Sequence, residues 1–294
     1  MGFIGLGTMG TPMALNVHRA GYSLGVYNRS APRTLPFQQE DINVFQTPAE
    51  LANWADIIIV MVFGPEALMA VLNQVDGIAS ANISGKTVIN MSTVSRETTL
   101  EVGGIVEECG ALFLDAPVAG SKKPAEDGSL TILVGGSAGL LESVRSLLDC
   151  MGKTIILCGD TGAGTDMKLF INLLLGNLMQ SFAEALTLGK SFGLSLDDML
   201  ETVSSSAVTC PMYTVKGNAI RSGNFEKNFP VELIFKDLNL ALQAGDRENV
   251  PLPTTEAARG AFKEAMAQGL GDQDLCAVIK VLEETTGLKV RGEE

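Results

Sequence analysis

The chain has 294 residues, of which 46% are hydrophobic and 19% charged, a balance typical of a globular protein rather than a disordered one. Its net charge of −13 argues against a nucleic-acid partner, because phosphates would be repelled. No basic segment precedes an apolar run at the start, and the apolar run at 57–63 is too short to span a bilayer. We therefore expect a cytoplasmic protein without a membrane partner.

The five cysteines are scattered without a Cys-x-x-Cys pair, and His18 is the single histidine. Thiols arranged in this way predict free cysteines and no metal site. His18 lies next to Arg19 on the first predicted helix, where a solvated or capping role is expected. Any acid–base chemistry is therefore expected to use residues other than histidine.

The first half of the chain alternates short β-branched runs with helical patterns. Strands are predicted at 2–5, 23–27, 57–62, 87–90, 112–117, 130–135 and 154–157, and helices at 10–20, 66–73, 96–109 and 140–151. This alternation predicts an α/β domain over residues 1–162, with a mostly parallel, doubly wound sheet of the Rossmann type covered by helices on both faces.

The second half shows helical spacing only. A long connecting helix is predicted at about 165–192, followed by helices near 196–206, 212–222, 231–248, 254–269 and 277–285. Residues 163–294 are therefore expected to form an all-α domain for substrate binding and oligomerisation. Helices this apolar on several faces usually pack on each other and on another subunit, so we expect a homodimer or homotetramer.

A glycine motif follows the first predicted strand and opens the first predicted helix. It reads Gly5, Leu6, Gly7, Thr8, Met9 and Gly10. In such a motif the first glycine permits a tight turn, the second lets the backbone approach a pyrophosphate, and the third allows close helix–strand packing. The sequence therefore predicts a dinucleotide-binding loop at the very start of the chain.

The end of the second predicted strand carries Asn28, Arg29 and Ser30, with Arg33 soon after. NAD sites usually have a carboxylate at this point for the ribose hydroxyls, and a carboxylate would repel a 2′-phosphate. A guanidinium instead pairs with phosphate and stacks on adenine. These residues favour NADP(H) over NAD(H), and we also expect Met61 and Val62 to contact the cofactor.

Four motifs, in this order, resemble those of the β-hydroxyacid dehydrogenases, the family of 3-hydroxyisobutyrate dehydrogenase. They are the glycine motif at 5–10, Asn-Met-Ser-Thr at 90–93, Asp-Ala-Pro-Val at 115–118 and Gly-Thr-Asp-Met-Lys-Leu-Phe-Ile-Asn at 164–172. The segments at 121–128 and 235–238 are similar to those of the glyoxylate/succinic-semialdehyde reductase branch, also called γ-hydroxybutyrate dehydrogenases.

The resemblance implies a role for several residues. Lys168 matches the catalytic lysine and Asn172 the asparagine that orients the substrate. Thr93 matches a residue near the nicotinamide and Lys236 one that contacts the cofactor. Phe229 and Asp237 match positions that line the reductase active site, where Asp237 is either a general base or half of a solvated pair with Lys236.

The residue types suit carbonyl reduction. Negative charge builds on the carbonyl oxygen as hydride reaches carbon, and a nearby cation stabilises that charge and donates the proton. A lysine becomes a better donor when burial lowers its pKa, and we expect Lys168 to be buried early on the apolar helix. Asn172, four residues on, lies on the same helix face.

One position departs from the family. The resemblance implies a serine after Val118 that binds the substrate carboxylate, but this chain has Ala119. Ser121, or backbone amides at Gly120 and Ser121, could replace the lost hydroxyl. The expected activity is NADPH-dependent reduction of small semialdehyde or 2-oxo acids. The alternatives are an NADP-dependent 3-hydroxyisobutyrate or other β-hydroxyacid dehydrogenase, and a non-catalytic nucleotide-binding interaction module.

Overall fold

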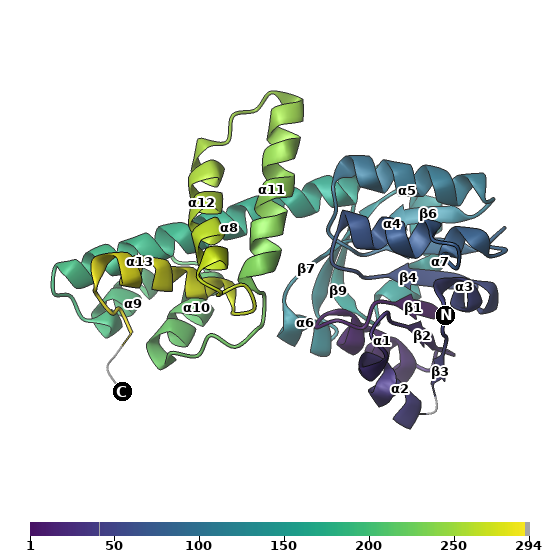
Figure 1. The fold of residues 1–294 in the computed structure, drawn as a ribbon, viewed down its shortest axis with the longest axis horizontal. Coiled ribbons are helices and arrows are strands. Elements are labelled where there is room, and N and C mark those ends of the chain that lie inside the picture. Colours follow the sequence, from purple (N-terminus) through teal and green to yellow (C-terminus); the bar gives the residue numbers. More distant parts are fainter. Residues whose placement is uncertain (41, 292–294) are drawn as a thin grey trace. The chain divides into compact units, whose positions relative to one another are not determined.

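The computed structural model describes residues 1–40 and 42–291. The chain divides into two compact units, the first spanning Met1–Phe170 and the second beginning at Ile171. The first unit is an α/β layer structure (Figure 1). Its strands are β1 (Gly2–Ile4), β2 (Gly25–Tyr27), β3 (Asn43–Val44), β4 (Ile57–Val60), β5 (Thr87–Asn90), β6 (Leu112–Asp115), β7 (Val118–Ala119), β8 (Leu130–Gly135) and β9 (Gly152–Gly159). Its helices are α1 (Gly10–Arg19), α2 (Leu35–Gln39), α3 (Pro48–Trp54), α4 (Pro65–Asn73), α5 (Arg96–Glu108), α6 (Lys122–Glu126) and α7 (Ala138–Leu148).

The strands form one sheet in the order β3-β2-β1-β4-β5-β6-β8-β7, with β9 paired to β8. The first six are parallel and follow the order of a dinucleotide-binding domain, in which strand succession reverses beside β1. Ligands of such sheets bind at the carboxyl ends of the strands next to this reversal. The glycine motif after β1, and Met61 and Val62 after β4, lie at this place.

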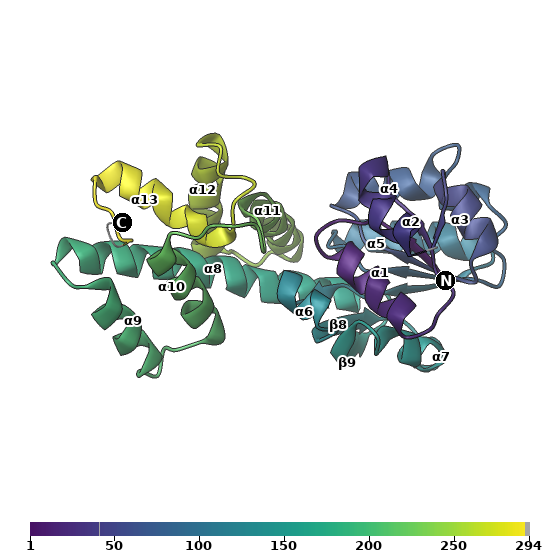
Figure 2. The ribbon, with the colours of Figure 1, turned by 90° about the horizontal axis from the view of Figure 1, so that it is seen from below.

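Helices cover both faces of the sheet, as Figure 2 shows from below. Alternate strand residues point to opposite faces and pack into two separate cores. On one face, Phe3, Ile59 and Leu114 pack with residues of α1, α2, α6 and α7. On the other, Ile4, Ile58 and Val88 pack with residues of α3, α4 and α5. The doubly wound sheet predicted from the alternating pattern is confirmed.

One local prediction was wrong, and one helix was not predicted. The strand predicted at 112–117 ends at Asp115, and the chain turns at Pro117 into the separate strand β7, which runs antiparallel to β8. Proline cannot donate a ladder hydrogen bond, so it interrupts a strand. Helix α3 was not predicted, although a Thr followed three residues later by a Glu is a typical helix-start pattern. In the structure the Thr47 hydroxyl accepts a hydrogen bond from the Glu50 N–H at the start of this helix.

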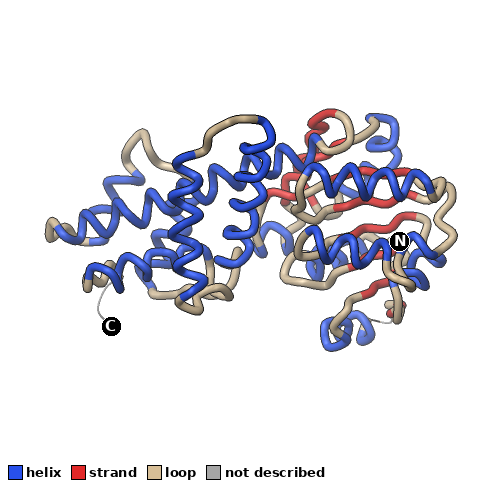
Figure 3. The backbone as a smooth tube through the Cα atoms, turned by 45° about the horizontal axis from the view of Figure 1, so that its top comes forward, coloured by secondary structure: helices blue, strands red, loops and turns tan. Residues whose placement is uncertain are grey.

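The second unit is helical, and Figure 3 shows no strand in its described part. It contains most of α8 (Ala163–Ser191), then α9 (Leu196–Ser204), α10 (Pro211–Ser222), α11 (Val231–Glu248), α12 (Pro253–Ala267) and α13 (Ile279–Thr286). Its core takes side chains from each of these helices, among them Phe182, Leu238 and Phe262. The all-α second half is confirmed.

Helix α8 is long and apolar enough to cross a membrane by length and composition alone, with a mean hydropathy of 1.3 over the qualifying window. Of that window, 44% is buried inside the structure. One such helix is weak evidence for membrane insertion, because the central helix of a globular protein meets the same criteria. Helix α8 also contains polar side chains that are buried inside the structure, among them Asn172 and Gln180.

Candidate active site

The three glycines of the loop after β1 differ in how closely the chain packs around them. Gly5 has φ +98°, and a Cβ there would overlap the Met61 carbonyl oxygen. A Cβ on Gly10 would overlap the Gly5 carbonyl oxygen, so α1 could not pack as closely on β1. At Gly7 an added Cβ would meet no described atom within 4 Å. The loop therefore has room at Gly7 for a pyrophosphate to approach the backbone, and the residues present fit a dinucleotide.

Asn28 braces this loop. Its Oδ1 accepts a hydrogen bond of 2.9 Å from the Leu6 N–H, and its Nδ2 donates to the Ser30 carbonyl at 3.0 Å. Both ends of the amide are thus bonded within the protein, and these bonds fix which end is oxygen. Asn28 therefore acts on the nucleotide site through the loop that it holds.

The residues expected at a 2′-phosphate lie beyond Asn28. Arg29, Ser30 and Arg33 are exposed, and one Arg33 nitrogen donates to the Leu6 carbonyl at 3.4 Å. At the neighbouring strand ends, Met61, Val62 and Thr93 are half-buried, with the Val62 N–H donating to the Ser92 hydroxyl at 2.9 Å. The remaining loop residues, Thr8 and Met9, are also half-buried.

Lys168 and Asn172 lie one turn apart on α8. Their exposed fractions are 6% and 2%, so the burial expected for Lys168 is present. Helix α8 begins at Ala163, which places Lys168 in its second turn.

In the helical unit, Asp237 organises two other predicted site residues. Its Oδ2 accepts from Asn172 Nδ2 at 2.6 Å, and its Oδ1 is 2.6 Å from Lys236 Nζ. The Asp237 side chain is 2% exposed and that of Lys236 15%, so the pair is not the solvated one considered from the sequence. With both oxygens engaged, Asp237 is placed to orient the Asn172 amide and the Lys236 ammonium.

Phe229 is half-buried just before α11, and a buried ion pair holds its backbone. Asp274 Oδ2 accepts from the Phe229 N–H at 3.2 Å and lies 2.8 Å from Lys216 Nζ. Charges are rarely buried unless paired, and here the pair also fixes a predicted substrate contact. Sequence spacing could not reveal these contacts, because Asp274 lies 45 residues from Phe229 and 58 from Lys216 along the chain.

The segment after β7, which the sequence predicts to bind the substrate, contains Gly120, which is exposed, and Ser121, which is half-buried. Ser121 precedes α6 but its side chain makes no capping bond to that helix. Ala119 pairs across the sheet with Thr131 of β8. Val118 and Ile132 face the core, so Ala119 and Thr131, both half-buried, share the opposite face.

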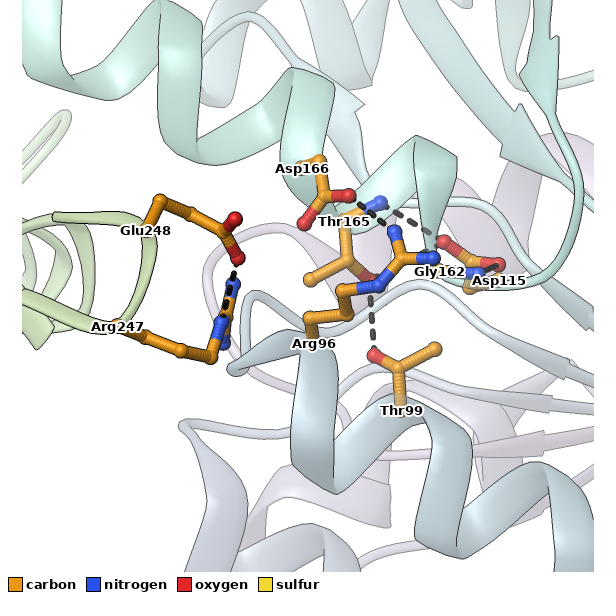
Figure 4. A network of polar contacts seen from close by, with 8 residues as sticks. All are labelled: Arg96, Thr99, Asp115, Gly162, Thr165, Asp166, Arg247 and Glu248. Carbon is orange, nitrogen blue, oxygen red and sulfur yellow. Dashed lines mark hydrogen bonds and ion pairs between the residues drawn. The ribbon is translucent and has the colours of Figure 1, made fainter. Parts of the chain in front are cut away.

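A buried carboxylate at the end of β6 had no role assigned from the sequence. Asp115 is 0% exposed, and its oxygens accept bonds from the start of α8: 2.7 Å from Gly162 N–H, 2.7 Å from Thr165 N–H and 3.1 Å from the Thr165 hydroxyl (Figure 4). Burial raises the pKa of Asp115 above its usual value, and these hydrogen bonds oppose the rise. Its partners lie some fifty residues later in the chain, which is why spacing could not reveal them.

Among the described residues no group of three His, Cys, Asp or Glu side chains is arranged to hold a metal ion. All five cysteines are free thiols in the structure. Burial raises the pKa of the Cys276 thiol far above its usual value, so this cysteine is a poor nucleophile.

Comparisons with known proteins also indicate a nicotinamide-dependent dehydrogenase fold. Residues 1–159 match the model of the NAD binding domain of 6-phosphogluconate dehydrogenase, and residues 162–282 match the NAD-binding model of NADP-dependent 3-hydroxyisobutyrate dehydrogenase. The chain is 37% identical to glyoxylate/succinic semialdehyde reductase 1 of Arabidopsis thaliana, over 96% of this chain and 98% of the relative.

It is also 39% identical to 2-(hydroxymethyl)glutarate dehydrogenase of Eubacterium barkeri, over 99% of this chain and 97% of the relative. Among solved structures it resembles 3-hydroxyisobutyrate dehydrogenase of Salmonella typhimurium, with a TM-score of 0.86 and 28% identity, over 95% of this chain and 98% of that one.

Proposed function

Because the chain belongs to the 3-hydroxyisobutyrate dehydrogenase-like family of NAD(P)-dependent oxidoreductases that act on CH–OH groups, we propose that it reduces small semialdehyde or 2-oxo acids, such as succinic semialdehyde and glyoxylate, with NADPH. The observation that carries the proposal is the buried Lys168, one helical turn before Asn172, whose amide is bonded to Asp237.

In the proposed mechanism Lys168 Nζ donates a hydrogen bond to the carbonyl oxygen of the substrate. As negative charge grows on that oxygen the ammonium stabilises it and then transfers a proton to it, giving the hydroxyl group. NADPH supplies the hydride when bound. Asn172, which Asp237 fixes, holds the substrate or the lysine in the reactive orientation.

The preference for NADPH rests on charge. Arg29 and Arg33 are exposed beyond the end of β2, and no carboxylate stands at position 28. A guanidinium binds a phosphate through two charge-assisted bonds, whereas the uncharged ribose hydroxyl of NADH gains little from it.

A substrate panel tests the proposed reaction. Initial rates are measured with glyoxylate, succinic semialdehyde and 3-hydroxyisobutyrate, each with the NADP and the NAD forms of the cofactor. We expect the highest kcat/KM for an aldehyde or oxo acid with NADPH. A higher kcat/KM for 3-hydroxyisobutyrate with NADP would instead establish the β-hydroxyacid dehydrogenase alternative, and no turnover with tight NADPH binding would establish the non-catalytic one.

The exchange Ala119→Ser tests how the substrate carboxylate is bound. A hydrogen bond to a charged group contributes about 1.5–3 kcal/mol, so we expect a lower KM for succinic semialdehyde and little change in the KM for NADPH. The added hydroxyl fits the half-buried face that Ala119 shares with Thr131. Thr131→Val is the companion variant, because cross-strand Cβ atoms lie about 4.5–5.5 Å apart and the Thr131 hydroxyl is a candidate replacement donor. An unchanged or higher KM in Ala119→Ser would place the carboxylate elsewhere.

We also propose that the chain forms a homo-oligomer. Apolar side chains spaced three or four residues apart are exposed along α8, namely Met167, Phe170, Ile171, Leu174 and Leu178. A stripe of this kind is costly in water and typical of a subunit contact. Light scattering measures the molar mass in solution and tests this proposal. We expect a multiple of the 31.0 kDa monomer mass, and a mass of 31.0 kDa would contradict it.

A further inference from the structure

The start of α8 is bound to the sheet by the Asp115 carboxylate. Both of its oxygens accept from the first turn of the helix or the residue before it, at 2.7 Å from Gly162 N–H and 2.7 Å from Thr165 N–H. The first N–H groups of a helix have no partner within the helix, and the dipole makes that end positive. Asp115 therefore serves as the cap of α8 although it belongs to a strand.

Two glycines show how closely the helix start presses on this carboxylate. A Cβ on Gly135, at the end of β8, would overlap Asp115 Oδ1 and lie 2.8 Å from Gly164 N. A Cβ on Gly164, in the first turn of α8, would lie 2.8 Å from Gly135 N and 2.9 Å from Asp115 Oδ2. Because neither glycine has a side chain, the start of α8 packs directly against the end of β8 and against Asp115. The helix start therefore cannot shift or rotate without breaking its bonds to Asp115.

The same turn of α8 is bound to α5. The Thr165 hydroxyl, which donates to Asp115 at 3.1 Å, also lies 2.8 Å from the Thr99 hydroxyl, and Arg96 pairs with Asp166. Figure 4 shows these side chains converging on the helix start. Thr99 and Thr165 are 0% and 1% exposed, so solvent does not compete for these bonds.

Lys168 follows Thr165 by three residues, which is less than one helical turn. We infer that Asp115 is a positioning residue for Lys168: by fixing Gly162 and Thr165 it sets the rotation and height of the helix turn from which the lysine projects. The inference rests on the proposed role of Lys168 as proton donor. A buried carboxyl group is costly unless it is hydrogen-bonded, and the two oxygens of Asp115 supply the two acceptors that the Gly162 and Thr165 N–H groups require.

The test is Asp115→Asn, which keeps the shape but turns one acceptor into an NH₂ group facing an N–H donor. A misplacement of about 1 Å can cost on the order of 10²-fold in rate, so we expect kcat to fall about 10- to 100-fold. The NADPH dissociation constant should stay within about threefold, because the glycine loop is untouched. Measurements use the full chain and the best substrate of the panel.

A double-mutant cycle separates positioning from general loss of structure. In the Lys168→Ala protein no lysine remains to be positioned, so adding Asp115→Asn should leave the residual kcat within about twofold. Leu51→Ala is the control for stability: Leu51 is 0% exposed and packs near Gly2, at the amino end of β1, so this variant should lower Tm but not kcat.

If Asp115→Asn does not fold, Thr165→Val tests the same anchor. It keeps the backbone bond and removes the hydroxyl bonds to Asp115 and Thr99, and kcat should fall several-fold, whereas Thr165→Ser should restore it. An inactive Lys168→Ala together with normal kcat in folded Asp115→Asn, or in Thr165→Val where Asp115→Asn does not fold, overturns the inference alone. A normal rate in Lys168→Ala overturns the proposed donor, and with it the inference.

Discussion

Replacing Lys168 by alanine is expected to lower kcat by roughly 10²–10⁴-fold, the range typical of a positioned general acid, with NADPH affinity nearly unchanged. The side chain is buried at 6% exposure on the face of α8 that also carries Asn172, and alanine leaves no proton donor there. Single-turnover rates and an NADPH fluorescence titration measure the two quantities separately.

The matched control is Lys190→Ala, which removes a lysine from the last turn of the same helix. The two positions are about 33 Å apart by helical rise, so this variant should keep the wild-type rate. Lys168→Arg keeps the positive charge but supplies a group that does not release its proton, and should remain slow. If folded Lys168→Ala kept more than about half of the wild-type rate, Lys168 would not be the donor.

The exchange Arg29→Asp is expected to weaken NADPH binding by about 10- to 100-fold, since hydrogen bonds to charged groups contribute about 1.5–3 kcal/mol. NADH, which lacks the 2′-phosphate, should lose less than about threefold in affinity. Fluorescence titrations with both cofactors at fixed salt measure the difference, and salt must be held constant because exposed charges are screened.

Arg19→Asp makes the same change of charge at the far end of α1, about 14 Å from the helix start by helical rise. It should change both affinities equally and slightly, which separates a specific phosphate contact from the general effect of a more acidic protein. Equal losses for NADPH and NADH in Arg29→Asp would contradict the NADP assignment.

The sequence allowed the sheet and the long helices to be predicted because their signals are local. β-branched runs of three to six residues gave β1, β4, β5 and β8, and sustained helical spacing gave α8 and α11 to within about two residues. The elements that were missed are short, such as β3 and β7 with two residues each, and derive their stability from neighbours distant in the chain.

In the candidate site, too, local features could be predicted from the sequence and contacts between distant residues could not. Gly5, Gly7 and Gly10 could be assigned individual roles because the motif is contiguous and each role depends on adjacent backbone. The bonds from Asp115 to Thr165, from Asp274 to Phe229 and from Asn28 to Leu6 join residues between 22 and 50 positions apart. Pairings over such distances depend on the path of the folded chain, and no spacing rule encodes them.

The brace between Asn28 and the glycine loop has an evolutionary consequence. The Leu6 N–H requires only an oxygen acceptor at position 28, which an aspartate carboxylate supplies as well as an asparagine amide. The exchange loses the bond from Nδ2 to the Ser30 carbonyl, but that bond is exposed, so water can replace the donor. The codons of the two residues differ by a single base. A lineage can therefore exchange them, and with them the charge presented to the adenosine ribose, without dismantling the loop, so that cofactor preference in this scaffold is able to drift through intermediates that all remain folded.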